Sequence, residues 1–120
     1  MKIFLLTLLI TLNSFVSLLS SAADAARVIE LKTEKKGEVM HWMPEQIEVK
    51  AGEKIKIVAK HDLEGGFDFH GLSLPELKIS ESVQRHVPLT IERTISLKPG
   101  KYKIGCQFHP KHEPVTLIVK

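Results

Sequence analysis

The sequence predicts an all-β fold, a sandwich of two antiparallel sheets with about seven strands. From Arg27 onward, short runs rich in Val, Ile, Leu and Thr alternate apolar and polar side chains, the period-two pattern of a half-buried strand. Gly and Pro turn signals recur between the runs, and no stretch has a convincing helical period. Many short strands separated by frequent turns favour a β-sandwich over a mixed fold.

The expected strands can be followed along the chain in order. They are RVIELK (27–32), QIEV and KIKIVAK around a turn at Ala51-Gly52 (46–60), GGFDFHGLSL (65–74), LTIERTISL (89–97), KYKIGC (101–106) and VTLIVK (115–120). The segment PELKISESVQRH (75–86) is the one plausible helical piece, a polar connection with room for a turn or two. We find no internal repeat and no low-complexity linker, so a single domain is expected over residues 26–120.

Residues 1–25 have the layout of a secretory signal peptide. Lys2 gives a positive start, a mostly apolar run follows, and Ala23-Asp24-Ala25 offers a small-residue cleavage site. The alternative is an uncleaved anchor in the inner membrane, although an apolar run of about 17 residues is marginal for spanning a bilayer. We therefore expect a periplasmic or secreted protein with no membrane span after cleavage.

The charge pattern excludes one class of partner. The chain of 120 residues has a net charge of +3, scattered without a basic stripe or an aromatic ladder, so we expect no nucleic-acid binding. The expected state is a monomer. An exported domain with a single cysteine forms no internal disulfide, and its thiol therefore needs another explanation.

The segment GCQFHPKHEP (105–114) indicates that explanation. It places Cys106 ahead of His109 and His112 on a short loop before the last strand. These residues deliver two or three ligands from one side, and His70 on a neighbouring strand is the best candidate for the remaining ligand. One thiolate with imidazoles suits a single copper ion cycling between Cu(I) and Cu(II), and zinc is the less favoured alternative. The competing interpretation of Cys106 is a small buried apolar side chain.

These residues also resemble the cupredoxins, the blue-copper family. The segments MPEQIEVKAGEKIKIV, FHGLSLPEL, LKPGKYKIGCQFHPKH and VTLIVK carry the resemblance, which covers about residues 38–120. It implies a Greek-key β-sandwich, with His70 as the early histidine ligand, Cys106 as the thiolate and His109 as the second imidazole. A single cysteine also excludes the dinuclear copper centre that some cupredoxins carry.

The fourth ligand departs from the usual family pattern. His112 stands where many cupredoxins have an axial Met, and the remaining methionines, Met40 and Met43, lie far upstream. The loop is similar to that of nitrosocyanin, a red-copper cupredoxin with a glutamate ligand. That similarity makes Glu64 a rival to His70. Because no axial Met is available, Glu113 is the alternative if His112 is not the fourth ligand. His112 is otherwise simply an exposed loop residue.

Other histidines and aromatic residues have simpler explanations. His61 and His86 lie in polar connections and are expected to be exposed. In VMHWMP, Trp42 is expected in the core with its neighbours pointing outward, while a Cu(I) entry site of Met40, His41 and Met43 is the alternative. Phe67, Phe69 and Phe108 are expected to pack, with Phe108 lining the site.

Three functions remain open from the sequence. The first is one-electron transfer, with a reduction potential lower than in Met-ligated relatives and a green or red colour. The second is copper binding for delivery, storage or resistance. The third is a red-copper small-molecule or catalytic site, which ranks last because no acid–base pair or nucleophile supports it. We therefore expect a protein that is not an enzyme. Its expected partner is a redox protein or a copper donor or acceptor of unknown identity.

Overall fold

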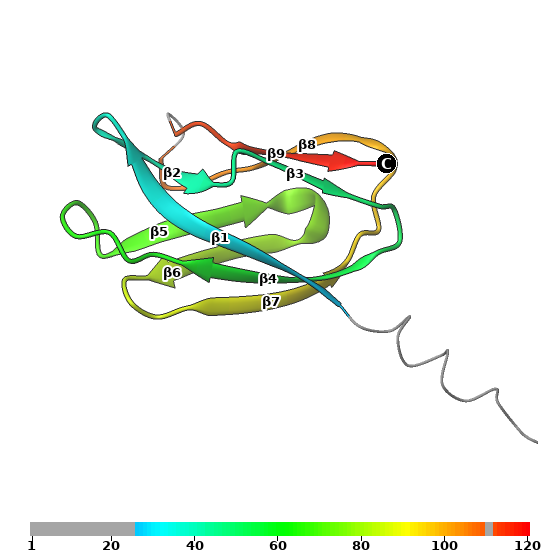
Figure 1. Ribbon diagram of the computed structural model, residues 1–120, viewed down its shortest axis with the longest axis horizontal. Helices are drawn as coiled ribbons and strands as arrows, with labels where there is room; N and C mark the ends of the chain where they lie inside the picture. The colour runs from blue at the N-terminus through cyan, green and yellow to red at the C-terminus, as the bar shows by residue number, and fades with distance from the viewer. Residues whose placement is uncertain (1–25, 110–111) are drawn as a thin grey trace, which may run out of the picture.

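The computed structural model describes residues 26–109 and 112–120, and the expected signal peptide lies outside these residues. The described chain is an all-β sandwich, as the sequence predicts (Figure 1). Its strands are β1 (Arg27–Lys36), β2 (Val39–Met43), β3 (Gln46–Val49), β4 (Lys54–Lys60), β5 (Phe69–Leu74), β6 (Ile79–Gln84), β7 (Leu89–Thr94), β8 (Gly100–Ile104) and β9 (Val115–Val119). Among the described residues, no helix is long and apolar enough to span a bilayer.

The strands form three sheets, with the orders β2-β1-β4-β7, β3-β9-β8 and β5-β6. β1 pairs with β4 in parallel, and β3 pairs with β9 in parallel. The expectation of wholly antiparallel sheets is therefore wrong. The turn at Ala51-Gly52 does join two strands, but β3 and β4 belong to different sheets, so this turn carries the chain across the sandwich.

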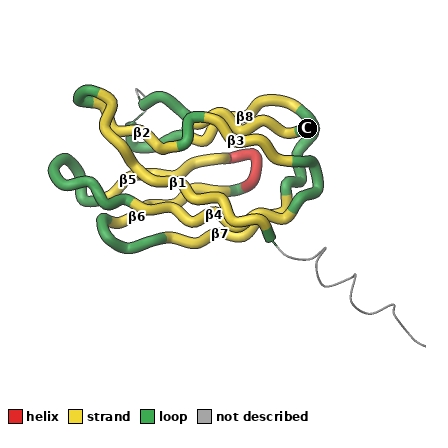
Figure 2. The backbone as a smooth tube through the Cα atoms, viewed as in Figure 1, coloured by secondary structure: helices red, strands yellow, loops and turns green. Residues whose placement is uncertain are grey.

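Two strands were missed by the sequence analysis. β2 contains the VMHWM run, and β6 falls within the segment expected to be helical. Only the 3-10 turn η1 (Pro75–Leu77) is helical there, and Lys78 ends it in a left-handed conformation (Figure 2). The segment ISESVQ buries just Ile79 and Val83, so its polar composition hid a strand of a two-stranded hairpin.

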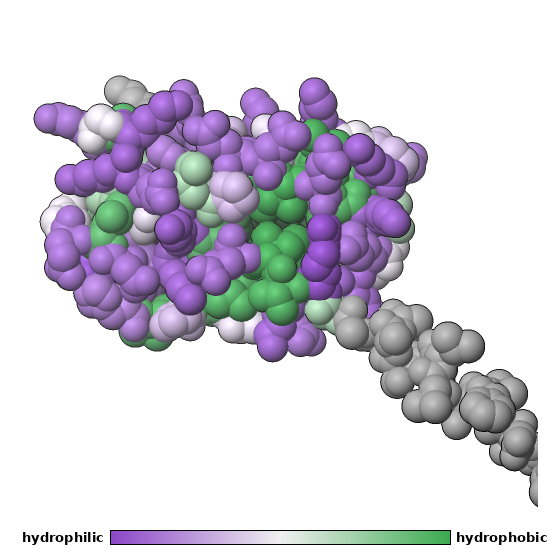
Figure 3. Space-filling view, viewed as in Figure 1, coloured by the Kyte–Doolittle hydropathy of each residue, from purple (hydrophilic) through white to green (hydrophobic). Residues whose placement is uncertain are grey.

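One core draws side chains from all three sheets. Alternate residues of β1 and β4, such as Leu31 and Ile57, pack with Leu72 and Leu74 of β5 and with Leu117 of β9. The residues between them on β1 and β4 are mostly charged and face solvent. Figure 3 shows that hydrophilic side chains cover most of the face in view, around a hydrophobic area in its middle. This alternation is what the period-two pattern indicated.

Candidate metal centre

His70 lies on β5, where the strand turns its side chain inward. Its side chain is only 2% exposed, and it faces Val83 across the β5–β6 hairpin. The ring of Trp42 meets His70 edge-on, with the ring centroids 5.0 Å apart, and the Trp42 indole N–H donates to the Gly71 carbonyl oxygen over 2.8 Å. Packing and a hydrogen bond therefore hold this part of β5 in place.

Cys106 lies two residues after the end of β8 and is buried as a free thiol. Two hydrogen bonds join the neighbouring strands here: Ser73 N–H to Gly105 O at 2.8 Å, and Gly105 N–H to Ser73 O at 2.9 Å. A third comes from the Gly71 N–H, which donates to the Cys106 Sγ over 3.2 Å. The strand that carries His70 is thereby fixed against the residue that carries the thiol.

His109 and His112 are brought back toward Cys106 by two successive turns. The His109 N–H donates to Cys106 O over 3.2 Å, and the His112 N–H donates to His109 O over 3.1 Å. Both imidazoles are half-buried, in contrast to the fully buried His70. The loops that carry these side chains lie at the end of the sandwich opposite the C-terminus (Figure 1).

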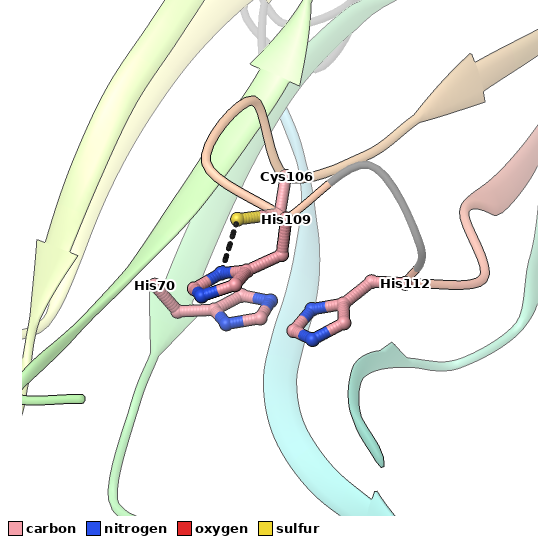
Figure 4. A group of neighbouring side chains, drawn as sticks. All are labelled: His70, Cys106, His109 and His112. Carbon is pink, nitrogen blue, oxygen red and sulfur yellow. Dashed lines mark hydrogen bonds between the residues drawn. The ribbon is translucent and has the colours of Figure 1, made fainter. Parts of the chain in front are cut away.

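These four side chains converge on a common point (Figure 4). One ligand atom from each of His70, Cys106, His109 and His112 lies within 4.8 Å of the others. The Cys106 Sγ and the His109 Nδ1 are 3.5 Å apart, and the three imidazole rings are parallel to within 15°. Ligands at about 2.0–2.3 Å from an ion are at most roughly 4–4.6 Å apart, so small side-chain shifts complete the site.

Two imidazole nitrogens in this cluster lack an ordinary partner. The His70 Nε2 and the His112 Nδ1 are buried with no hydrogen-bond partner among the described residues. A buried polar atom without a partner is costly, and coordination of a metal ion is one way to satisfy imidazole nitrogens. The residues present therefore fit a metal ion.

The protonation of the cluster also favours metal binding. Burial lowers the pKa of His70 to about 3, and repulsion from the nearby histidines, His112 first and then His61, His109 and His41, acts in the same direction. Burial and the nearby His109 and His41 lower the pKa of His112 as well. Both rings are therefore neutral at pH 7, and the neutral imidazole is the form that binds metal ions.

The alternative ligand Glu64 lies away from this cluster. Its side chain is 77% exposed, and its Oε1 pairs with the His86 Nε2 at 2.9 Å. Glu113 is exposed beside His112 and is not among the four converging side chains. The geometry therefore favours His70 over Glu64, and His112 over Glu113.

The burial of Trp42 and of the other histidines agrees with the sequence predictions in part. Trp42 is in the core as expected, at 2% exposure, but His41 is buried beside it instead of pointing outward. His61 was expected in solvent and is fully buried, with its Nδ1 2.8 Å from the Thr33 Oγ1. His86 is exposed, as expected. The polar sequence around His61 hid its burial: the residue directly follows β4 and forms an isolated bridge with Arg85.

The aromatic side chains around the cluster also differ from expectation. Phe108 is half exposed and packs edge-on against Phe69, with the ring centroids 5.3 Å apart. Phe67, which was expected simply to pack, lies on the His109 ring with the centroids 4.8 Å apart. Of these three phenylalanines, Phe67 is therefore the one whose ring contacts a candidate ligand among the described residues.

Comparison with solved structures supports the fold. At 16% identity, the chain is similar to the metal-binding domain of the Streptococcus pneumoniae Cu(I)-exporting P-type ATPase CopA with Cu(I), over 78% of this chain and 84% of that chain, with a TM-score of 0.62. A copper binding protein in the apo form is 15% identical over 77% of this chain and 98% of that chain, with a TM-score of 0.55. An oxidised amicyanin mutant is 13% identical over 84% and 88%, with a TM-score of 0.50.

Sequence comparison identifies the family. No curated protein sequence matches the chain significantly. The family model described as "Cupredoxin-like domain" matches residues 3–119, nearly the whole chain. With the β-sandwich and the copper-protein neighbours above, this match shows that the chain belongs to the cupredoxin-like domain family.

Proposed function

We propose that this protein binds one copper ion through His70, Cys106, His109 and His112 and serves in one-electron transfer. The observation that carries the proposal is the convergence of one thiol and three imidazoles within 4.8 Å, at the end of a cupredoxin-like sandwich. Bound copper would supply a one-electron couple, since thiolate sulfur stabilises Cu(I) and imidazole nitrogen stabilises Cu(II). Zinc fits the same ligands and is the competing ion.

The protein's contribution is to hold these side chains in place before and after an electron moves. His70 is fixed by burial and by the Trp42 ring, and Cys106 by the hydrogen bond from Gly71. Side chains that are already positioned move little when the charge at the site changes, which favours fast transfer. His109 and His112 are half-buried, so an electron partner can approach them closely.

The identity of the fourth ligand sets the expected potential. An imidazole at His112 is a harder donor than a thioether and stabilises Cu(II) relative to Cu(I). We therefore propose a reduction potential below that of cupredoxins with a Met ligand, and a green or red protein.

A second candidate function is copper delivery, storage or resistance without an electron partner. Two of the four donors are half-buried at the surface, where an acceptor protein can reach them. The similarity in fold to the Cu(I)-bound domain of an exporting ATPase agrees with this candidate. We propose no enzymatic role, and we propose that the protein is exported and monomeric, with a redox partner or a copper-exchange protein as its partner.

Two measurements on recombinant protein test the proposal and separate the two candidates. Copper content and visible absorption are compared between the wild type and Cys106→Ser. We expect one copper per chain and a strong sulfur-to-copper absorption that Cys106→Ser abolishes. A reversible potential with fast electron self-exchange then supports electron transfer, whereas slow self-exchange with rapid copper release to an acceptor supports delivery. A wild type that takes up no copper contradicts both.

A further inference from the structure

The loop between β4 and β5 (residues 61–68) is held by one arginine from the turn after β6. Arg85 Nε donates to Leu63 O over 2.7 Å, and Nη2 donates to Gly65 O over 2.7 Å and to Phe67 O over 3.0 Å. Its Nη1 forms an ion pair with Asp68 Oδ1 at 2.7 Å. The Arg85 side chain is only 17% exposed, although Asp68 is 85% exposed. One planar guanidinium thus satisfies three carbonyl groups of a single loop.

A buried histidine reinforces the same point of the loop. The His61 Nε2 lies 3.1 Å from the Phe67 carbonyl oxygen, which can only accept, so this nitrogen carries the proton. In the neutral ring, Nδ1 then accepts from the Thr33 hydroxyl at 2.8 Å. The Phe67 carbonyl therefore receives hydrogen bonds from both His61 and Arg85. Two backbone hydrogen bonds, from Arg85 N–H to Asp68 O and from His86 N–H to His61 O, tie both ends of the loop to the same turn.

The residue fixed in this way is the one that lies on a candidate copper ligand. The Phe67 ring packs on His109 with the centroids 4.8 Å apart and an interplanar angle of 41°. Its other described ring contact is with Phe69, at 6.1 Å, and Phe67 is still 56% exposed. A large apolar side chain so exposed gains little from core burial. Its backbone carbonyl oxygen nevertheless accepts two side-chain hydrogen bonds, from His61 and from Arg85.

We propose that Arg85 is a positioning residue that holds Phe67 as a cover over His109, and that this cover slows exchange of the bound ion. The proposal rests on the proposed function, because it concerns release of copper from that site. An apolar ring over His109 hinders the approach of water or a competing ligand to the imidazole–metal bond. Lysine cannot substitute, because an ammonium lacks the planar fork that bonds several carbonyls at once.

The experiment measures the rate at which copper-loaded protein loses its ion to an excess of a Cu(I) chelator. The variants are Phe67→Ala, Phe67→Leu, Arg85→Lys and the double variant Phe67→Ala/Arg85→Lys. We expect a rate increase of about tenfold in Phe67→Ala and in Arg85→Lys, and a rate close to the wild type in Phe67→Leu, which keeps an apolar cover. Because both residues act through one ring, the double variant is expected to match the single variants instead of multiplying their effects.

A matched control separates loss of position from loss of stability. Arg93 donates to the carbonyl oxygens of Leu77 and Glu92, distant in sequence from the β4–β5 loop. Arg93→Lys loses a comparable guanidinium without disturbing Phe67, so its release rate should equal that of the wild type. Equal release rates for Arg85→Lys and the wild type would overturn the proposal. Effects that multiply in the double variant would overturn it as well.

A measurement on the metal-free protein tests the positioning role of Arg85 separately from the copper assignment. Nuclear Overhauser contacts between the Phe67 and His109 rings are expected in the wild type and in Arg93→Lys, and should be lost in Arg85→Lys. If the contact persists in Arg85→Lys, the positioning role is wrong whatever metal binds. If the contact is lost as expected but the wild type takes up no copper, the positioning role of Arg85 is confirmed and the proposed copper function is wrong.

Discussion

Gly71 and Cys106 approach each other so closely that a side chain at position 71 has no room. The Gly71 N–H donates to the Cys106 Sγ over 3.2 Å. A Cβ at Gly71 would lie 2.9 Å from that sulfur and would clash with the Gln107 Oε1. The glycine after His70 thus lets two strands of different sheets meet at the candidate site, and the sulfur receives a donor that stabilises a thiolate.

The first prediction follows from this contact. In Gly71→Ala the new methyl group must displace the sulfur or Gln107, whose amide also donates to Glu81 O over 3.0 Å. We expect a loss of about 1–3 kcal/mol in the free energy of unfolding of the metal-free protein, measured in urea. Gly105→Ala is the matched control, because its Cβ would only touch Pro114 at 4.0 Å. Equal stability of Gly71→Ala and the wild type would show that the strands are not in close contact.

The second prediction uses the single tryptophan of the chain as a reporter. The Trp42 ring lies 5.0 Å from His70, so an ion at the site is close to the indole. An open-shell Cu(II) ion bound to His70 should quench most of the Trp42 fluorescence, because it accepts energy or an electron from the excited ring. Zn(II), with a closed shell, should not. Copper uptake at one equivalent with unchanged fluorescence would place the ion elsewhere.

The third prediction concerns pH and the metal-free protein. The pKa of His70 is lowered to about 3 by burial, below its value of 6.5 in the unfolded chain. Between these values the unfolded chain binds the proton more readily, so this contribution to stability is full above about pH 6.5 and is lost as the pH falls toward 3. The lowered pKa of His112 has the same sign. We expect a loss on the order of a few kcal/mol by pH 4.

A variant isolates the contribution of His70. His70→Gln removes the titrating ring, so its free energy of unfolding should fall less between pH 7 and pH 4 than that of the wild type. Carboxylates contribute equally to both proteins and cancel in the difference. An identical pH dependence for the two proteins would mean that His70 is not buried in the neutral form.

The fourth prediction tests the role of His112. In His112→Met a thioether replaces the imidazole, which should raise the reduction potential and shift the colour toward blue. Glu64→Gln and Glu113→Gln serve as controls, because Glu64 pairs with His86 and Glu113 is exposed beside the cluster. Cyclic voltammetry of the copper-loaded variants measures the effect. A change of potential in Glu64→Gln with none in His112→Met would reverse the ligand assignment.

Much of the fold was predictable because several strands bury one face in the core and turn the other toward solvent. β3, β4 and β7 alternate cleanly, so Ile47, Ile57 and Ile91 could be assigned to the core from period two alone. β6 could not, because it is a short hairpin strand with two buried residues, and its composition is polar. The parallel pairings were also hidden, because sequence periodicity gives the faces of a strand but not its neighbours.

The candidate site was predictable where local spacing sufficed. Cys106, His109 and His112 share a loop, and the inward position of His70 follows from its place in a β-rich run. The roles of His61, Arg85 and Phe67 depend on a loop meeting a turn from another part of the chain, for which the sequence gives no local signal. The polar neighbours of His61, which follows the end of β4, gave no sign that its side chain is buried.

X-ray absorption at the copper edge of the protein loaded with one equivalent of copper tests the central claim most directly. The spectrum should require one sulfur and two or three imidazole nitrogens around the ion, and Cys106→Ser should lose the sulfur contribution. A wild-type spectrum that fits with nitrogen and oxygen neighbours alone would contradict coordination by Cys106, and with it the proposed copper centre.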